Sequence, residues 1–246
     1  MFKKLVPINA EAHKNAKIQP VNSFDFARSF HIASVNVNEF PRAAASFPIV
    51  FVKSPNGEEY RPIALFGTNE GQNSFIDEDG KWDAPYIPAI LRRYPFGVAQ
   101  VNDKDDETSF AICVDEESDA YNETEGQALF NEDGSATEFL EKVRDFLTEL
   151  QKQEVMTSRF CELLTKHELL IEQTLELTSA DGSKKRLTGF YLIDEKKFRE
   201  LPDQTFLEFR HKGVLDAIYS QLSSLAQVPR LARQSFAKAA SEETEA

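Results

Sequence analysis

Glu70-Gly-Gln-Asn-Ser-Phe-Ile-Asp-Glu-Asp-Gly80 is the stretch that organises this chain, because it returns as Glu125-Gly-Gln-Ala-Leu-Phe-Asn-Glu-Asp-Gly134, one residue shorter. Near its start each copy has a glycine, which tolerates a positive φ angle, and it closes on a carboxylate-Asp-Gly turn typical of hairpins. Two runs rich in β-branched and aromatic residues precede each copy, at 48–52 and 62–66 and again at 96–101 and 109–114. With a helix expected after each copy, the repeat predicts a duplicated strand-strand-strand-helix unit over residues 47–94 and 96–152. A chance match of two short motifs is the alternative.

A helical pattern comes directly after the second copy. Ser135-Ala-Thr-Glu138 is a capping box, which marks the start of a helix, and apolar residues recur at helical spacing from Phe139 to Leu150. The same pattern continues to Leu164 without an intervening Gly or Pro. One long helix and a pair of helices are both compatible with this pattern.

The last third of the chain predicts a hairpin and C-terminal helices. The hairpin pairs residues 175–178 with 187–193 across a turn at 180–183. Asp194 and Asp203 are suitable N-caps for two short helices, and Pro229 is expected to end a final amphipathic helix.

Together these elements predict an α+β fold. We expect an antiparallel sheet built from the duplicated strand-strand-strand-helix unit, then a helix or helix pair, a hairpin and C-terminal helices. Residues 1–229 are expected to form a single domain and residues 230–246 a flexible tail.

Composition is that of a globular protein. Of 246 residues, 41% are hydrophobic and 20 are Phe, which is enough for a sizeable core. The amino terminus lacks the apolar run of a secretory signal, and no segment approaches the roughly 20 apolar residues of a membrane helix. We therefore expect a cytoplasmic protein without membrane insertion.

The net charge of −13 is concentrated in residues 102–134, where twelve acids face a single base, Lys104. Nucleic acid is a poor partner for such a surface, because its binding requires clustered Lys and Arg. Two explanations stay open: solubility through self-repulsion, and an acidic face for a basic partner.

The sequence contains no recognisable catalytic or metal-binding constellation. Cys113 and Cys161 lack a third sulfur or a histidine at zinc-like spacing, so we interpret them as reduced, buried residues. The Glu-Asp-Gly turns do not match the EF-hand loop, which has a glycine at position six and a carboxylate at position one. With Gly80 at position six, position one is Phe75, and with Gly134 it is Leu129. Nucleophile elbows, phosphate-binding loops and dinucleotide fingerprints do not occur. We expect no catalytic residue, metal or cofactor.

The main candidate for a functional site is Trp82-Asp-Ala-Pro-Tyr-Ile-Pro-Ala-Ile-Leu-Arg-Arg-Tyr-Pro-Phe96, which holds the only tryptophan and an arginine pair. Pro88 and Pro95 are expected to bound a short helix. In a structural interpretation, the residues spaced by four form a buried stripe (Trp82, Tyr86, Ile90 and Tyr94), and the arginines cap the helix and bridge to acids at 77–79. In a functional interpretation, the block binds a carboxylate, a phosphate or a peptide end. The binding residues are then Trp82, Asp83, Tyr86, Arg92, Arg93 and Tyr94.

At this block the sequence resembles the SapC family. The resemblance extends over almost the whole chain, through Pro7-Ile-Asn, His13-Lys14, Phe47-Pro-Ile-Val-Phe-Val52, Phe75-Ile-Asp-Glu-Asp-Gly80-Lys-Trp82, Tyr86-Ile-Pro-Ala, Arg92-Arg-Tyr-Pro-Phe96, Leu129-Phe-Asn-Glu-Asp-Gly134, Thr188-Gly-Phe-Tyr191 and the region around Leu222. Asn131 replaces an expected aspartate, which weakens any metal role for that turn. The family is named for bacterial surface-layer gene regions, and its genes often lie near TonB-type receptors and flavin-dependent halogenase-like proteins. The resemblance implies a cytoplasmic accessory to surface-layer or outer-membrane uptake systems and supplies no catalytic residue.

Three functions are compatible with the sequence. The first is a binding protein that recognises a protein or peptide partner through residues 82–96 without turnover. The alternative is an enzyme acting on an amino acid or peptide, with Arg92 or Arg93 holding the substrate carboxylate. A structural component of a surface lattice is disfavoured, because the sequence shows no export signal.

Overall fold

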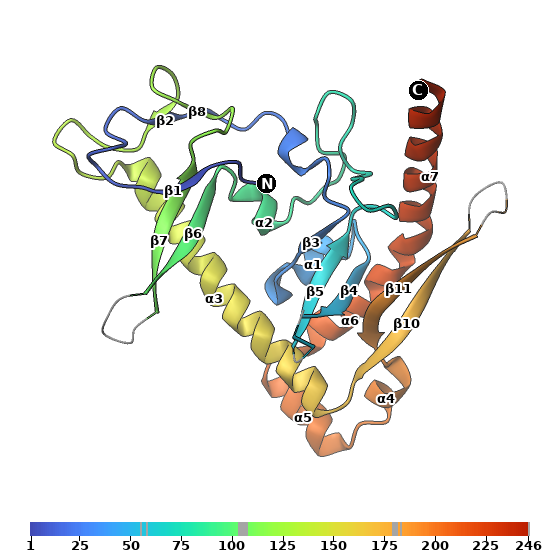
Figure 1. Cartoon of the computed structure of the whole chain (residues 1–246). Helices are drawn as coiled ribbons and strands as arrows, with labels where there is room; N and C mark the ends of the chain where they lie inside the picture. Colours follow the sequence, from blue (N-terminus) through green and yellow to red (C-terminus); the bar gives the residue numbers. More distant parts are fainter. Residues whose placement is uncertain (55, 58, 103–107, 179–181, 183, 246) are drawn as a thin grey trace. The chain divides into compact units, whose positions relative to one another are not determined.

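The computed structural model describes residues 1–246 with the exception of 55, 58, 103–107, 179–181, 183 and 246 (Figure 1). The chain forms two compact units that interleave in sequence. The first unit comprises Met1–Phe26 and Ala89–Lys152, and the second comprises Ala27–Pro88 and Gln153–Ala246. The expected single domain over residues 1–229 stays a prediction, because it concerns whether the two units fold together.

An antiparallel three-stranded sheet, in the order β1-β7-β6, is the framework of the first unit. Its strands are β1 (Leu5–Pro7), β6 (Phe96–Asn102) and β7 (Thr108–Asp115). The predicted hairpin is present, with Phe96 opposite Val114 and Asn102 opposite Thr108. The acidic residues 103–107 that join its strands lie outside the described residues. A small second sheet has the order β8-β2-β9, formed by β2 (Lys17–Ile18), β8 (Tyr121–Asn122) and β9 (Gln127–Ala128).

The core of the first unit lies between this framework and helix α3 (Glu138–Lys166). Phe96 and Val114 are buried on the sheet, and Leu140 and Leu147 are buried on the helix. Because side chains alternate along a strand and recur every three to four residues along a helix, each element presents one apolar face to this core. The pattern of the sequence therefore accounts for the packing.

Helix α3 is one continuous helix of 29 residues, so one long helix is the correct alternative. The division between the two units falls within it. Its start differs from the prediction, because Thr137 rather than Ser135 precedes the first turn and accepts the Leu140 N–H on its Oγ1 at 3.3 Å. Ser135 belongs to the preceding turn, where its hydroxyl donates to Asp133 Oδ1 at 2.6 Å.

The second unit contains a five-stranded antiparallel sheet in the order β10-β11-β4-β5-β3. Its strands are β3 (Ile32–Ser34), β4 (Ile49–Lys53), β5 (Tyr60–Leu65), β10 (Leu170–Thr178) and β11 (Lys184–Ile193). The hairpin predicted in the last third of the chain is β10-β11, which joins the sheet where Tyr191 pairs with Phe51. Most of its turn at 180–183 lies outside the described residues.

Further helices, most of them short, accompany α3 and the sheets. They are η1 (Asp25–Ala27), η2 (Val37–Glu39), α1 (Phe40–Ala43), α2 (Ala89–Arg92), α4 (Glu195–Arg199), α5 (Asp203–His211), α6 (Leu215–Ser224), η3 (Leu225–Gln227) and α7 (Val228–Glu245). Asp194 caps α4 as predicted, whereas α5 begins at Asp203 itself with Pro202 in the N-cap position. Mixed helices and antiparallel sheets confirm the α+β prediction. Among the described helices, none has both the length and the apolar character needed to cross a bilayer.

The C-terminal segment differs from its prediction. Pro229 does not stop a helix but lies in the first turn of α7, where the missing proline N–H is tolerated. Ser235 is buried, and Lys238 Nζ donates to the carbonyl oxygens of Asn73 at 2.7 Å and Ile76 at 2.9 Å. Residues 230–238 therefore pack within the second unit, and a flexible tail over 230–246 stays a prediction.

The two Glu-Asp-Gly turns share one backbone geometry. Ile76 bridges to Trp82, and Phe130 bridges to Ala136. In the first turn the Asp77 N–H donates to the Lys81 carbonyl oxygen at 3.0 Å, and in the second the Asn131 N–H donates to the Ser135 carbonyl oxygen at 2.8 Å. The glycine of each turn has a positive φ. This geometry supports the duplication, which stays a prediction. The copies differ in their helices, because the helix after the first turn is only the single turn α2.

Candidate functional site

Trp82 closes an aromatic cluster inside the second unit. Its ring centroid lies 5.9, 5.2 and 6.1 Å from those of Phe47, Phe66 and Phe75, which are fully buried. The indole Nε1 donates to the carbonyl oxygen of Tyr86 at 2.8 Å. Trp82 therefore behaves as a core aromatic residue with a satisfied polar group.

Tyr86 is held by a short hydrogen bond to a buried carboxylate. Its hydroxyl donates to Glu39 Oε1 at 2.6 Å, and Glu39 is only 5% exposed. The second carboxylate oxygen accepts the Asn36 N–H at 2.9 Å in the capping box of η2. Asp83 differs from its neighbours, because its backbone N–H bonds to the Phe75 carbonyl while its side chain is exposed.

The two arginines of the predicted site lie in the first unit, at the end of α2. Arg92 is exposed, and its guanidinium carbon is 5.5 Å from the ring centroid of Phe146. The guanidinium carbon of Arg93 is 5.4 Å from the ring centroid of Phe2. Both geometries are cation–π contacts, which at exposed sites contribute about 0.5–1 kcal/mol each.

Tyr94 stacks between two rings of the same unit. Its centroid is 4.0 Å from that of Phe26 and 6.1 Å from that of Phe2. Burial raises the pKa of its hydroxyl, so the phenol stays protonated at neutral pH.

The six predicted binding residues thus divide between the two units: Trp82, Asp83 and Tyr86 belong to the second, and Arg92, Arg93 and Tyr94 to the first. The short helix expected between Pro88 and Pro95 is α2, and Trp82 and Tyr86 lie outside it. The binding interpretation stays a proposal, and within each unit most of these side chains already pack against aromatic rings.

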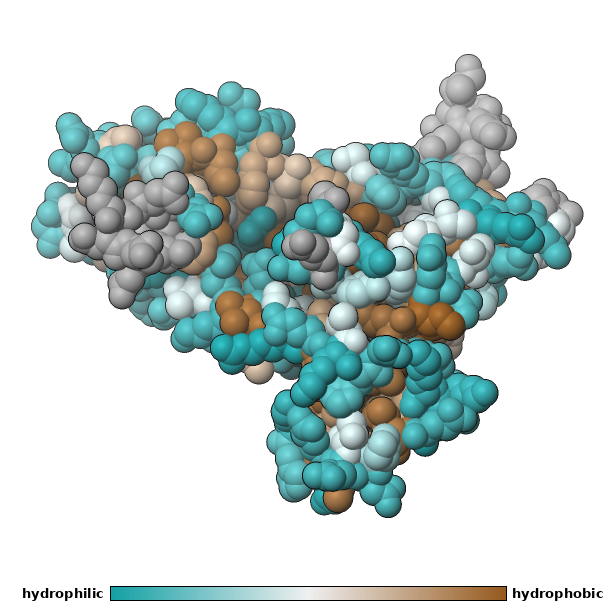
Figure 2. Space-filling model, turned by 60° about the horizontal axis from the view of Figure 1, so that its bottom comes forward, coloured by the Kyte–Doolittle hydropathy of each residue, from teal (hydrophilic) through white to brown (hydrophobic). Residues whose placement is uncertain are grey.

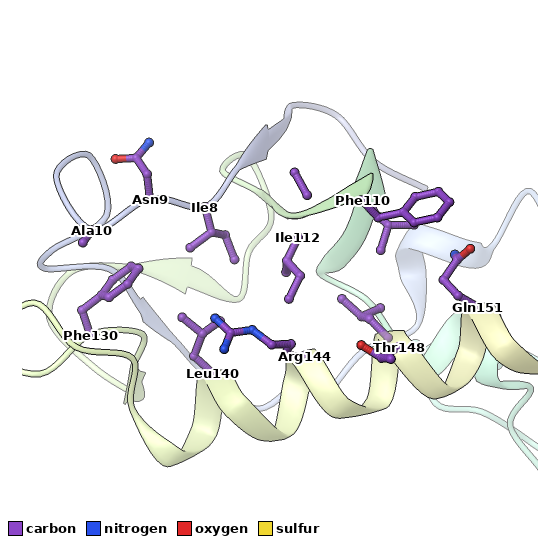
Figure 3. Close-up of a pocket in the computed structure, with 13 residues that line it drawn as sticks. Ile8, Asn9, Ala10, Phe110, Ile112, Phe130, Leu140, Arg144, Thr148 and Gln151 are labelled. Carbon is purple, nitrogen blue, oxygen red and sulfur yellow. The ribbon is translucent and has the colours of Figure 1, made fainter. Parts of the chain in front are cut away.

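An open groove lies in the first unit between α3 and the sheet β1-β7-β6 (Figure 3). Its volume of about 570 Å³ falls within the ~300–1,000 Å³ range of ligand pockets. Figure 3 shows Ile8 and Ile112 directed toward the helix, and Leu140 directed back toward them. The apolar side chains of the lining are Ile8, Ala10, Val98, Phe110, Ala111, Ile112, Phe130, Leu140 and Leu147.

Polar side chains line the helix side of the groove. Among the lining residues, all of which are described, Arg144 alone is charged, and Thr148 and Gln151 come after it along α3. The Arg144 Nη1 donates to both carboxylate oxygens of Glu141 at 2.8 Å. This ion pair is half-exposed, so it contributes less than about 1 kcal/mol and can rearrange at small cost.

Phe110 stands at one end of the groove and is 51% exposed. In the described part of the chain, the other large hydrophobic residues with comparable exposure are Val155, Met156, Ile171, Leu207 and Tyr219. The face drawn in Figure 2 is mainly hydrophilic, with separate hydrophobic patches. An exposed aromatic ring beside an apolar groove is typical of recognition surfaces.

The two thiols are poorly suited to catalysis. Cys113 and Cys161 are free and buried, as predicted. Burial raises the pKa of Cys161 to about 12 and also raises the pKa of Cys113. A thiol that stays protonated at neutral pH is a weak nucleophile. Over the described residues, no three His, Cys, Asp or Glu side chains converge to hold a metal ion.

Sequence reasoning does not identify the groove. Phe110 and Ile112 alternate in a strand pattern, and Leu140, Leu147 and Gln151 fit a helical one, so each pattern predicts an ordinary core face. The sequence does not indicate that α3 leaves part of the sheet face open. The one signal in the sequence is Phe110, which lies close to the acidic connection between the strands.

Comparisons with known proteins add a family but no individual relative. No curated protein and no solved structure matches the chain. The family model described as SapC matches residues 8–231, which is most of the chain and includes both Glu-Asp-Gly turns, both halves of the Trp82 block and the groove. The chain therefore belongs to the SapC family.

Proposed function

We propose that this SapC-family protein is a binding protein that holds a segment of a protein or peptide partner in the groove of its first unit, without chemical turnover. The groove itself carries the proposal. It is long, open and lined mainly by aliphatic side chains, with Phe110 exposed at one end. An open apolar groove suits a segment that enters from the side and stays attached to a larger molecule.

The exposed members of the sequence-predicted site are proposed as further contacts, each within its own unit. They are Arg92 in the first unit and Asp83 in the second. In this proposal, the surfaces that carry these two residues are stabilised by the other members of the site, which are Trp82, Tyr86, Arg93 and Tyr94.

We further propose a cytoplasmic accessory role in surface-layer or outer-membrane uptake systems. Membership of the SapC family supports this role, and cell fractionation tests it. Recovery of the protein in the soluble cytoplasmic fraction is expected, and recovery outside the inner membrane would contradict it.

The alternative function, an enzyme that clamps a carboxylate with Arg92 or Arg93, has less support. A clamp requires both branches of the guanidinium fork to face a ligand. Each guanidinium instead lies over an aromatic ring of its own unit. The binding function is therefore preferred.

Site-specific photo-crosslinking in the native cell tests the proposal. A photoreactive amino acid at Thr148, which lines the groove, should give an adduct with a partner protein that mass spectrometry identifies and purified components reproduce. The same amino acid at Thr165, exposed on α3 but outside the groove lining, is the control. Equal crosslinking at the two positions, or none at Thr148, would rule out the groove as the binding site.

A further inference from the structure

We infer that the partner segment is an amphipathic α-helix whose apolar stripe is flanked by Lys and Arg. This inference rests on the proposed function, because it describes the occupant of the same groove. The shape of the groove indicates a helix, and the charge of the first unit indicates basic flanks.

Helix α3 leaves part of the sheet face in the first unit uncovered. In the first unit, α3 covers the face over Phe96 and Val114, which are buried. Val98 and Ile112 on the same face are only partly buried and line the groove. This face therefore keeps an apolar part beside α3, against which the apolar stripe of an amphipathic helix can pack.

The length of the groove sets the length of the occupant. Its lining along α3 extends from Leu140 to Gln151, which at 1.5 Å per residue is about 16 Å. A partner helix of three turns covers this distance and places apolar residues at i, i+4, i+7 and i+11 along it. Phe110 at one end and Phe130 among the lining residues then contact the outer anchors.

The first unit as a whole is acidic. Over Met1–Phe26 and Ala89–Lys152, the sequence holds eighteen Asp and Glu against ten Lys and Arg, a net charge of −8. On α3, Glu141, Asp145 and Glu149 form an acidic row at i, i+4 and i+8. The single cation of the lining, Arg144, is already paired with Glu141. A basic helix is attracted by this field, and an acidic one is repelled.

Peptide binding to the full-length protein tests the inference. The probe is a synthetic 14-residue peptide of Leu and Lys with leucines in the amphipathic pattern, fluorescently labelled and monitored by anisotropy. Two matched probes are a peptide with Glu in place of every Lys, and a Leu–Lys peptide of the same composition in scrambled order. Thr148→Trp fills the groove without changing charge, and Thr165→Trp on the same helix is its control.

The expected result is that the ordered Leu–Lys peptide binds at least tenfold more tightly than both matched peptides. Its affinity should fall at least tenfold in Thr148→Trp and stay within twofold in Thr165→Trp. If the Leu–Glu peptide binds equally well and Thr148→Trp still blocks it, the basic partner is excluded while groove binding stands. If no peptide depends on Thr148, the groove function itself fails. If the protein self-associates and Thr148→Trp separates the copies, the occupant is a second copy and the inference is wrong.

Discussion

The hydrogen bond between Tyr86 and Glu39 decides whether Tyr86 is structural, and Tyr86→Phe tests it directly. The substitution removes only the hydroxyl, which donates at 2.6 Å to a carboxylate that is 5% exposed. A hydrogen bond to a charged group is worth about 1.5–3 kcal/mol, and a buried acceptor that loses its donor adds desolvation cost. We therefore expect Tyr86→Phe to lower the free energy of unfolding by about 2 kcal/mol.

Equilibrium urea unfolding measures this loss. Trp82 is the only tryptophan and belongs to the same unit as Tyr86, so its fluorescence reports on the right part of the chain. The m-value should stay constant, which would show that only stability has changed. Tyr219→Phe is the matched control, because Tyr219 is 51% exposed and its substitution should stay within about 0.5 kcal/mol of wild type.

Glu39→Gln completes a double-mutant cycle. The amide still accepts a hydrogen bond but lacks the charge, so the combined variant should lose less stability than the sum of the two single variants, by about 0.5–3 kcal/mol. Strict additivity, or a Tyr86→Phe effect as small as that of Tyr219→Phe, would refute the structural role. In that case Tyr86 would be interpreted as a recognition residue, and Tyr86→Phe should lower the affinity for the partner instead of the stability.

The remaining predictions concern α7, Cys161 and the coupling of the units. Lys238→Met should cost about 1.5–3 kcal/mol in urea unfolding, because Nζ donates to two carbonyl oxygens, whereas exposed Arg233→Met on the same helix should be nearly neutral. Native Cys161 should resist a thiol reagent at pH 8, because burial raises the pKa of its thiol to about 12. The free energy of unfolding should fall above pH 9, because the thiol ionises there in the unfolded chain but stays protonated in the native one. Cys161→Val should remove the contribution of this thiol to the pH dependence. If residues 1–229 form one cooperative domain, far-UV circular dichroism and Trp82 fluorescence should give one coincident transition, and two separate midpoints would contradict it.

Local patterns predict most of the fold. Alternation along β6 and β7 and helical spacing along α3 set which faces are buried, and these short-range signals do not depend on the rest of the chain. The predictions that differ from the structure concern helix ends, where the same residue type is compatible with more than one position in a helix. Pro229 is a stop signal after one helix and equally suited to the first turn of the next, and only the packing of α7 against Asn73 and Ile76 decides between them.

The site is harder to predict, because a residue type that is rare in the chain does not for that reason take part in function. Trp82 and the arginine pair are unusual residues in this chain, yet an aromatic ring needs a partner ring or an acceptor as much in a core as in a binding site. The groove is built from common residues such as Ile8, Ile112 and Leu147, and its existence depends on how α3 lies across the sheet. That tertiary relation is absent from any local window of the sequence.

The two Glu-Asp-Gly turns show how one backbone geometry serves two surfaces. In the first turn, the residue after the glycine and lysine is Trp82, and its indole fills the space above Phe66 and Phe75. The corresponding residue of the second turn is Ala136, whose small side chain packs on the core, while its bridge partner Phe130 lines the groove. The same turn thus closes an aromatic core where a large side chain comes after it, and borders an open groove where a small one does. Side-chain volume at this position is therefore one difference between the two copies, beside the difference between the single turn α2 and the long helix α3.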